Sequence, residues 1–109
     1  MAHEAIPPGT LDMLILQTLA LGRHLHGFEI AEAIQDRSED VLRVEEGSLY
    51  PALQRLLINN WINGEWGKTD ENRRARYYRL TATGRKQLER ELSQYRRVSE
   101  AIGRILQPA

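Results

Sequence analysis

A chain of 109 residues with 41% apolar and 28% charged side chains suffices for one packed domain and leaves little room for a second. The absence of cysteine excludes disulfides and thiolate metal sites and suits a reducing compartment, so we expect a cytoplasmic protein. The net charge is zero, but residues 1–46 carry three basic and nine acidic side chains, whereas residues 47–109 carry twelve basic and six acidic ones. Such an asymmetry allows a neutral protein to have a basic face.

The N-terminal half of the chain predicts an arm followed by two helices. Residues 1–8, which end in two prolines, are expected to form a flexible arm. Apolar residues at helical spacing then predict a helix over residues 11–22, with Thr10 as its N-cap and a glycine as its stop. This apolar stretch is too short to span a bilayer, and we expect no contact with a membrane. A second helix is predicted over residues 27–37, and residues 41–44 are expected to pair briefly as a short strand.

The third predicted helix runs from Glu46 or Gly47 to about Asn59 and has two faces of opposite character. Its start is limited by Pro51, because proline is tolerated only near the beginning of a helix. One face is apolar and is expected to be buried: Leu49, Leu53, Leu56 and Leu57. The opposite face carries Ser48, Pro51, Gln54, Arg55 and Ile58, with Tyr50 at its edge.

The C-terminal half predicts a β-hairpin followed by a long helix. Aromatic and β-branched residues on both sides of the polar segment 67–75 are typical of a hairpin with a long tip. Residues 67–79 carry five basic side chains against two acidic ones. Thr81 is a natural N-cap for the last helix. Apolar residues recur along this helix at steps of three and four, which predicts a seam for a partner helix: Leu88, Leu92, Tyr95, Val98, Ile102 and Ile105.

The order of helix, helix, helix, hairpin and long helix predicts an α+β, mostly α fold, the winged helix-turn-helix. We expect residues 1–8 to be the arm, residues 9–81 to form the winged-helix DNA-binding domain, and residues 82–109 to form a C-terminal dimerisation helix. In this fold the third helix enters the major groove of DNA, and the hairpin contacts the nearby backbone or minor groove.

The chemistry of the third helix and the hairpin favours double-stranded DNA as the partner. Gln54 and Arg55 can make paired hydrogen bonds to adenine and guanine, respectively. Ser48 and Tyr50, near the start of the helix, are suited to bond phosphates. The hairpin adds side chains that can contact phosphates or a groove edge: Lys68, Asn72, Arg73, Arg74 and Arg76.

Three segments of the chain resemble the PadR family of transcriptional regulators, and the resemblance extends from about residue 9 to residue 106. The segments are His26-Gly27-Phe28-Glu29-Ile30, Gly47-Ser48-Leu49-Tyr50-Pro51-Ala52-Leu53 and Asn72-Arg73-Arg74-Ala75-Arg76-Tyr77-Tyr78-Arg79-Leu80-Thr81. Phe28 departs from the family, which often has tyrosine there, and the length is similar to that of the short, single-domain members. The resemblance implies a homodimer formed through the last helix, a two-fold symmetric operator and, usually, repression. It also implies release by a small aromatic or drug-like effector, a property that varies within the family.

Other functions find less support in these residues. No glycine-rich phosphate loop and no Ser/His/Asp cluster stands out, so an enzyme is not expected. The three histidines lack partners at the spacing of metal ligands, and no metal or cofactor is expected. Two other classes stay open: a winged helix that serves as a protein adaptor, and a ligand-binding protein with vestigial DNA contacts, for which Tyr95 at the seam is the place to look.

Each predicted site also has a plainer interpretation. Gln54 and Arg55 could be solvated residues of an ordinary surface helix, and the basic hairpin could be a solvent-exposed loop. The seam of the last helix could pack on its own domain. We favour a dimer because the seam is about five turns long, which is more than the three short helices of the same domain can cover.

Overall fold

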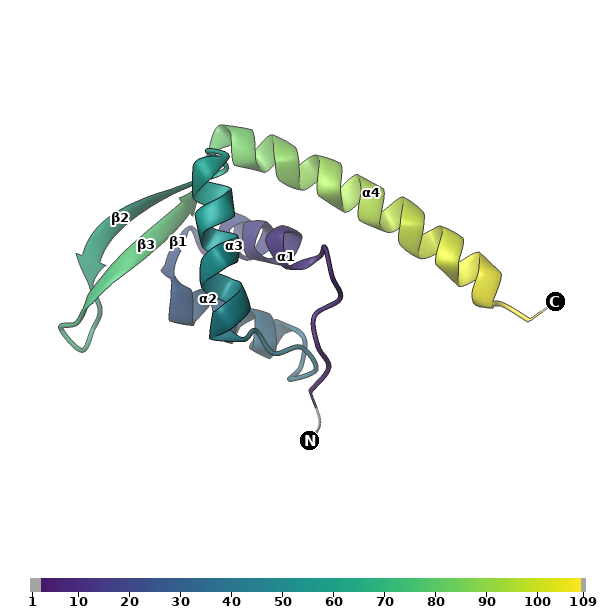
Figure 1. Cartoon of the computed structure of the whole chain (residues 1–109), viewed down its shortest axis with the longest axis horizontal. Helices are drawn as coiled ribbons and strands as arrows, with labels where there is room; N and C mark the ends of the chain where they lie inside the picture. The colour runs from purple at the N-terminus through teal and green to yellow at the C-terminus, as the bar shows by residue number, and fades with distance from the viewer. Residues whose placement is uncertain (1–2, 109) are drawn as a thin grey trace.

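The computed structural model describes residues 3–108, and its elements follow the predicted order (Figure 1). The helices are α1 (Leu11–Gly22), α2 (Gly27–Arg37), α3 (Glu46–Ile58) and α4 (Ala82–Leu106). The strands are β1 (His24–His26), β2 (Ile62–Lys68) and β3 (Arg74–Leu80), which form an antiparallel sheet in the order β1-β3-β2. The molecule is elongated, with extents of 58 × 36 × 22 Å, because most of α4 extends away from the other elements. The predicted mostly helical α+β fold class is confirmed.

The hydrophobic core lies between the first three helices, the base of the sheet and the start of α4. Helix α1 is central to it, in contact with α2, α3, β3 and α4. The regular recurrence of apolar residues along each helix accounts for this packing, because side chains three and four residues apart share one face. The core side chains are Met13, Ile15, Leu16, Leu19, Ile30, Ile34, Leu49, Ala52, Leu53, Leu56, Ile62, Tyr78 and Leu88.

Local capping explains where α2 and α4 begin. At α2 the backbone N–H of Glu29 donates to Nδ1 of His26 (3.3 Å), and the Glu29 carboxylate accepts from the His26 N–H (3.1 Å). These reciprocal bonds form a capping box with an imidazole in the usual place of a hydroxyl. At α4 the Thr81 hydroxyl accepts from the Gly84 N–H (2.9 Å), so the predicted N-cap is confirmed.

One local prediction is confirmed, the glycine that ends the first helix, and another is corrected. Gly22 is the last residue of α1, and the chain turns at Arg23, which has a positive φ of 72°. The turn leads directly into β1, a strand that sequence patterns did not predict, where Leu25 pairs with Tyr78. The short strand predicted at residues 41–44 is a single bridge from Leu42 to Glu4, because these residues lie against the N-terminal arm and not against the sheet.

Residues 3–8 of the predicted arm lie along the loop between α2 and α3, and residues 1 and 2 of that prediction lie outside the described residues. The Glu4 N–H donates to the Val41 carbonyl (2.7 Å), and His3 Nε2 lies 3.1 Å from Oδ1 of Asp40. Asp40 also accepts from the side-chain amide of Gln35, and these hydrogen bonds hold the pKa of the Asp40 carboxyl below its usual value. The arm therefore has specific contacts, whereas its predicted flexibility concerns motion and stays a prediction.

Candidate nucleic-acid interface

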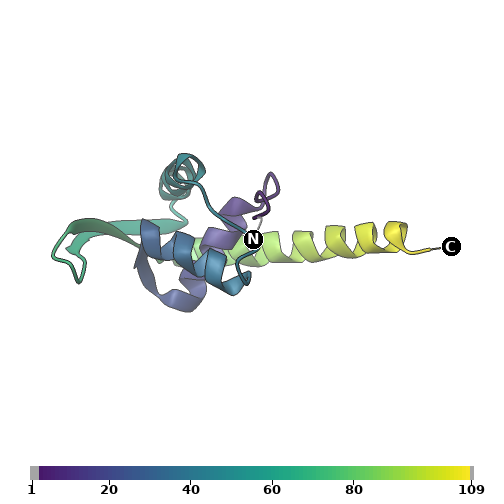
Figure 2. The same cartoon turned by 90° about the horizontal axis from the view of Figure 1, so that it is seen from below.

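Helix α3 presents one long side to solvent. Figure 2 shows α3 nearly end-on, standing out from the layer formed by the other helices and the sheet. Its buried residues are Leu49, Ala52, Leu53 and Leu56, while Leu57 is only half-buried, so Ala52 takes the inward place that we predicted for Leu57. The predicted polar face is exposed along its whole length: Ser48, Tyr50, Pro51, Gln54, Arg55 and Ile58. The two-faced character of this helix is thus confirmed.

Pro51 lies inside α3, five residues after Glu46, and not in the first turn. Proline has no N–H, so the Gly47 carbonyl cannot accept the helical hydrogen bond that residue 51 would otherwise donate. The ring faces solvent, where water is available to the freed carbonyl. The helix continues through this position because its opposite side is buried in the core.

Arg55 has a partner within the protein. Its Nη2 donates to Oδ1 of Asp12, in the first turn of α1, at 2.8 Å. The Arg55 side chain is 55% exposed, and that of Asp12 is 26% exposed. The ion pair connects the C-terminal half of α3 to α1 and holds the guanidinium at the flank of α3. Sequence reasoning placed Arg55 among the base-reading residues and missed this partner, which lies 43 residues away.

Tyr50 lies on the opposite flank of α3, against the start of α2. A Cβ at Gly27 would come within 3.2 Å of the Tyr50 hydroxyl oxygen, so glycine is what allows the two helices to approach here. The buried ring of Tyr78 is close enough for Tyr50 to affect its titration. Burial raises the pKa of the Tyr78 hydroxyl, and the nearby Arg76 opposes that rise. The contact that the structure shows for Tyr50 is therefore with the start of α2.

The hairpin of β2, β3 and the turn 69–73, here called the wing, has two distinct faces. Lys68, Trp66, Arg74 and Arg76 share the face that continues into buried Tyr78 and Ile62, because strand residues alternate between faces. Tyr77 and Arg79 lie on the other face. Of the two adjacent tyrosines, Tyr78 is buried, whereas Tyr77 packs against His24 and His26.

The basic side chains of the wing are held in different ways. The Arg74 guanidinium lies 4.4 Å from the ring centroid of Trp66, a cation–π contact on an exposed aromatic face. Arg76 is half-buried over Gly64, and its Nε has no hydrogen-bond partner among residues 3–108. Lys68, Asn72 and Arg73 are exposed. Asn72 has a positive φ of 63°, which closes the turn while its N–H donates to the Thr69 carbonyl (2.8 Å).

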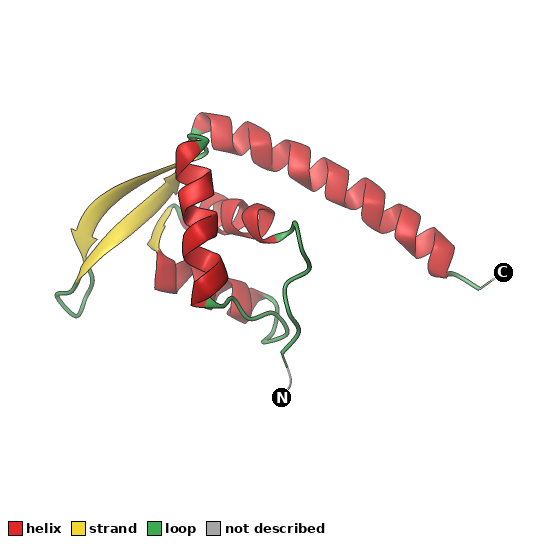
Figure 3. Ribbon diagram, viewed as in Figure 1, coloured by secondary structure: helices red, strands yellow, loops and turns green. Residues whose placement is uncertain are grey.

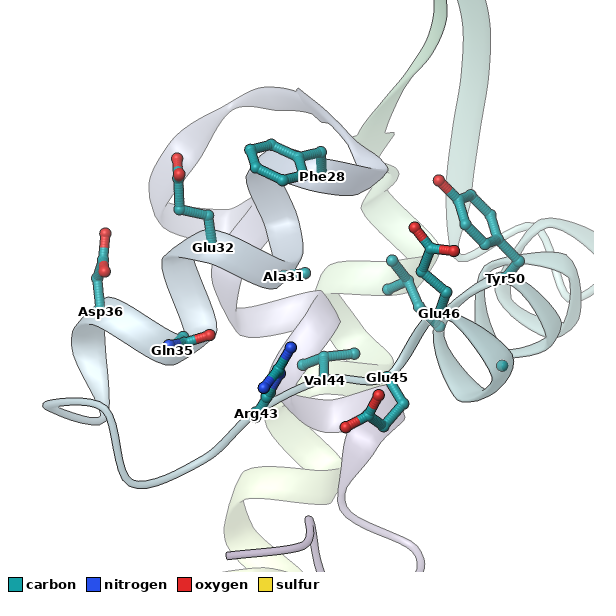
Figure 4. A pocket seen from close by; sticks show the side chains of 12 residues that line it. Phe28, Ala31, Glu32, Gln35, Asp36, Arg43, Val44, Glu45, Glu46 and Tyr50 are labelled. Carbon is teal, nitrogen blue, oxygen red and sulfur yellow. The ribbon is translucent and has the colours of Figure 1, made fainter. Parts of the chain in front are cut away.

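The groove between α2 and α3 has the opposite charge to the wing. Figure 4 shows Phe28 and Tyr50 on its two sides, with the carboxylates of Glu32, Asp36 and Glu46 around it. Four of its lining residues are acidic, and one is basic: Glu32, Asp36, Glu45, Glu46 and Arg43. A phosphate backbone would be repelled from this groove. This groove is therefore a poor site for a polyanion such as a nucleic acid.

The predicted seam of α4 is divided between two environments. Leu88 is 4% exposed and Leu92 is half-buried, and both pack on the core of their own domain. Leu88 is therefore a core residue with little surface left for a partner, whereas the place of half-buried Leu92 in the seam stays a prediction. Further along, the apolar side chains are at least half exposed: Tyr95, Val98, Ile102, Ile105 and Leu106. Figure 3 shows this part of α4 projecting beyond every other helix and strand.

Other kinds of site find no support in the described chain. Residues 3–108 contain no group of three histidine, aspartate or glutamate side chains placed to hold a metal ion. Over the same residues, no helix has the length and apolar character needed to cross a membrane.

The fold and this surface define a winged helix-turn-helix protein, with α2 and α3 as the helix-turn-helix and β2 with β3 as the wing. Residues 15–90 match the transcriptional regulator PadR-like family, and the chain belongs to that family. It is therefore a transcriptional regulator and not an enzyme.

Solved structures agree with this assignment. A transcriptional regulator from Clostridium thermocellum is 26% identical with a TM-score of 0.82, over 91% of this chain and 95% of that one. A PadR family transcription regulator from Clostridium difficile is 30% identical with a TM-score of 0.76, over 91% of this chain and 100% of that one. PadR of Bacillus subtilis, solved in complex with operator DNA, shares the fold at 23% identity and a TM-score of 0.67, over 76% of this chain and 47% of that one.

Proposed function

We propose that this protein is a sequence-specific DNA-binding repressor that acts in the cytoplasm as a homodimer on an inverted-repeat operator. The observation that carries the proposal is the exposed side of α3 next to the basic face of the wing. Helix α3 has the shape and hydrogen-bonding groups to enter the major groove, and the wing carries exposed cations that can bind phosphates. The fold is shared with a protein solved on operator DNA, Bacillus subtilis PadR.

The contact surface in this proposal has two parts. On α3, Gln54 faces the bases, and Ser48 and Arg55 lie on the flank toward α1 and the phosphates. Tyr50 lies on the other flank, where its hydroxyl would bond a phosphate only at the rim of the acidic groove. On the wing, the phosphate contacts come from Lys68, Asn72, Arg73, Arg74 and Arg76. The acidic groove between α2 and α3 limits the docking angle, because like charges would repel the backbone there.

The exposed apolar stripe of α4 supports the dimer. Tyr95, Val98 and Ile102 are each 50% exposed, and Ile105 is 81% exposed. Their spacing of three and four residues puts them on one side of a helix that extends beyond its own domain. A two-fold axis through this stripe would present two copies of α3 to DNA, and such symmetry requires an inverted repeat.

An aromatic effector, where one acts, would bind beside Tyr95. A groove between the start of α1 and α4 is lined by Met13, Tyr95 and Val98. It adjoins the stripe that we assign to the dimer, so a ligand there would alter the angle between the two protomers and thus the separation of the two α3 helices.

The test is selection from a pool of random duplexes at moderate salt, followed by sequencing. We expect enrichment of one inverted repeat whose half-sites lie about one helical turn apart. The Arg73→Ala and Arg74→Ala double variant should recover the same repeat with lower affinity. Failure of the wild-type protein to enrich any sequence would overturn the proposal and favour a protein adaptor.

A further inference from the structure

The outermost residues of α3 form a single row. Gly47, Pro51, Gln54 and Ile58 follow one another at steps of four, three and four residues, which keeps them on one line along a helix. The row lies opposite the buried residues, and all four of its members are exposed. Ile58 is 77% exposed, and no atom lies within 4 Å of a Cβ placed on Gly47. Among residues 3–108, nothing covers this row.

The other polar groups of α3 lie to either side of the row. Ser48 and Arg55 are seven residues apart and share the flank toward α1, where Asp12 binds the Arg55 guanidinium. Tyr50 lies on the flank toward α2, against Gly27. The row therefore contains one hydrogen-bonding side chain, Gln54, between two apolar ones. It has no cation to pair with guanine and no carboxylate to accept from cytosine.

This composition matches one kind of base pair. A glutamine amide makes two hydrogen bonds to N6 and N7 of adenine, and apolar side chains contact the C5-methyl group of thymine. The row from Gly47 to Ile58 is about 16 Å long at 1.5 Å per residue, the length of about five stacked base pairs. Gly47 leaves room at the start of the helix for a base-pair edge to approach.

We propose that this row makes the protein a reader of A·T base pairs: Gln54 binds an adenine, and Ile58 contacts the methyl group of a nearby thymine. Arg55 is a flanking contact to the backbone, restrained by Asp12, and does not read guanine. The inference rests on the proposed function, because it assigns base chemistry to the same helix. It also differs from the expectation, based on residue type alone, that Arg55 binds guanine.

The experiment uses the operator obtained by selection and changes one DNA atom group at a time. Deoxyuridine replaces each thymidine to remove the methyl group, and 7-deazaadenine replaces each adenine to remove N7. At one thymidine, we expect deoxyuridine to weaken wild-type binding about fourfold, the factor for losing the burial of about one methyl group. The Ile58→Ala variant should show no such loss there, and its fold should be unaffected because the side chain is mostly exposed.

The matched comparison is between variants of Gln54 and Arg55, which are adjacent polar residues of α3. At one adenine, 7-deazaadenine should weaken wild-type binding about tenfold, within the range for a paired base contact, and should leave Gln54→Ala binding unchanged. The Arg55→Ala variant should still lose affinity with deoxyuridine and with 7-deazaadenine, and it should prefer the same sequence as the wild type. The inference is overturned if Arg55→Ala alone alters the preferred base, or if neither base analogue affects the wild-type protein. Enrichment of no sequence at all would remove the proposed function as well, which separates the two failures.

Discussion

The ion pair between Arg55 and Asp12 illustrates how a residue's role depends on its neighbours. An arginine on the polar face of α3 has the chemistry to bind guanine. In the structure its guanidinium is bound by a carboxylate from α1, and reaching a base would require breaking that contact. Both side chains are accessible to water, so the pair contributes modestly to folding but determines where the cation is held.

The first prediction concerns Asp12→Asn. Loss of the carboxylate frees Arg55 and removes a negative charge beside the DNA, so binding to random duplexes should strengthen. The slope of log affinity against log salt should steepen by up to about 0.9, the value for one added phosphate contact. The free energy of unfolding should change by less than about 1 kcal/mol. Fluorescence anisotropy over a salt series measures the slope, and the same substitution in an Arg55→Ala background should have a smaller effect.

The second prediction concerns Gly84, in the first turn of α4. Alanine normally stabilises a helix relative to glycine by about 1 kcal/mol. Here a Cβ would lie 1.9 Å from the carbonyl oxygen of Trp61, and backbone must move to admit it. We expect Gly84→Ala to lower the free energy of unfolding by about 1–3 kcal/mol, the usual cost of overpacking. Urea denaturation gives the value, with exposed Thr83→Ala as the control; equal stability of the two variants would refute the packing argument.

At the scale of elements, the basic side chains of the wing are distributed between the two faces of the hairpin. Alternation sends Arg74 and Arg76 to the face that continues into buried Tyr78 and sends Arg79 to the other face. Trp66, directly across from Arg76 in the register, provides the surface on which Arg74 rests. A cation held on an aromatic ring loses less side-chain freedom when it meets a phosphate.

The third prediction uses this difference between faces. Arg74→Ala should weaken binding to the selected operator and to random duplexes by similar factors, and should reduce the salt slope by about 0.9. Arg79→Ala removes the same charge from the opposite face and should have a clearly smaller effect. Anisotropy titrations with both duplexes provide the comparison. Equal effects of the two variants would mean that long-range charge, and not contact by one face, accounts for the role of the wing.

At the scale of the whole molecule, the protomer is elongated, with its mass gathered at one end. A packed domain occupies one end, and the C-terminal part of α4 projects from it (Figure 1). The apolar stripe of this part is at least half exposed. Burying such a stripe removes apolar area from water, which favours association. Two copies joined in this way would also bind two half-sites at once, which multiplies affinity without any new contact to DNA.

The fourth prediction tests this arrangement with the double variant Val98→Glu and Ile102→Glu. We expect a folded monomer by sedimentation, because both side chains are half exposed and neither belongs to the core. Affinity for an inverted repeat should fall by about 100-fold or more, to that of a single half-site. Arg97→Glu with Arg104→Glu, on the other side of α4, should keep the mass of a dimer. A double variant that still sediments as a dimer would place the interface elsewhere.

Much of the fold was predictable from the sequence because its helices and hairpin are locally encoded. Apolar residues at spacings of three and four predicted the helices, and the span predicted for α2 is the span observed. Polar turn residues between aromatic segments predicted the wing. The exposed side of α3 followed in the same way, because the period of a helix assigns each side chain to a face.

The tertiary structure decided what depends on residues distant in sequence. Strand β1 has three residues and exists only through pairing with β3, so no local pattern could reveal it. The core position of Leu88 depends on α1, which covers that turn of α4 and leaves only the later part of the stripe for a partner. The position of Arg55 depends on Asp12 in the same way. The sequence by itself determined which faces exist, because periodicity is local, and only the folded chain decided which of those faces remain free, because burial and ion pairing are set by contacts across the whole molecule.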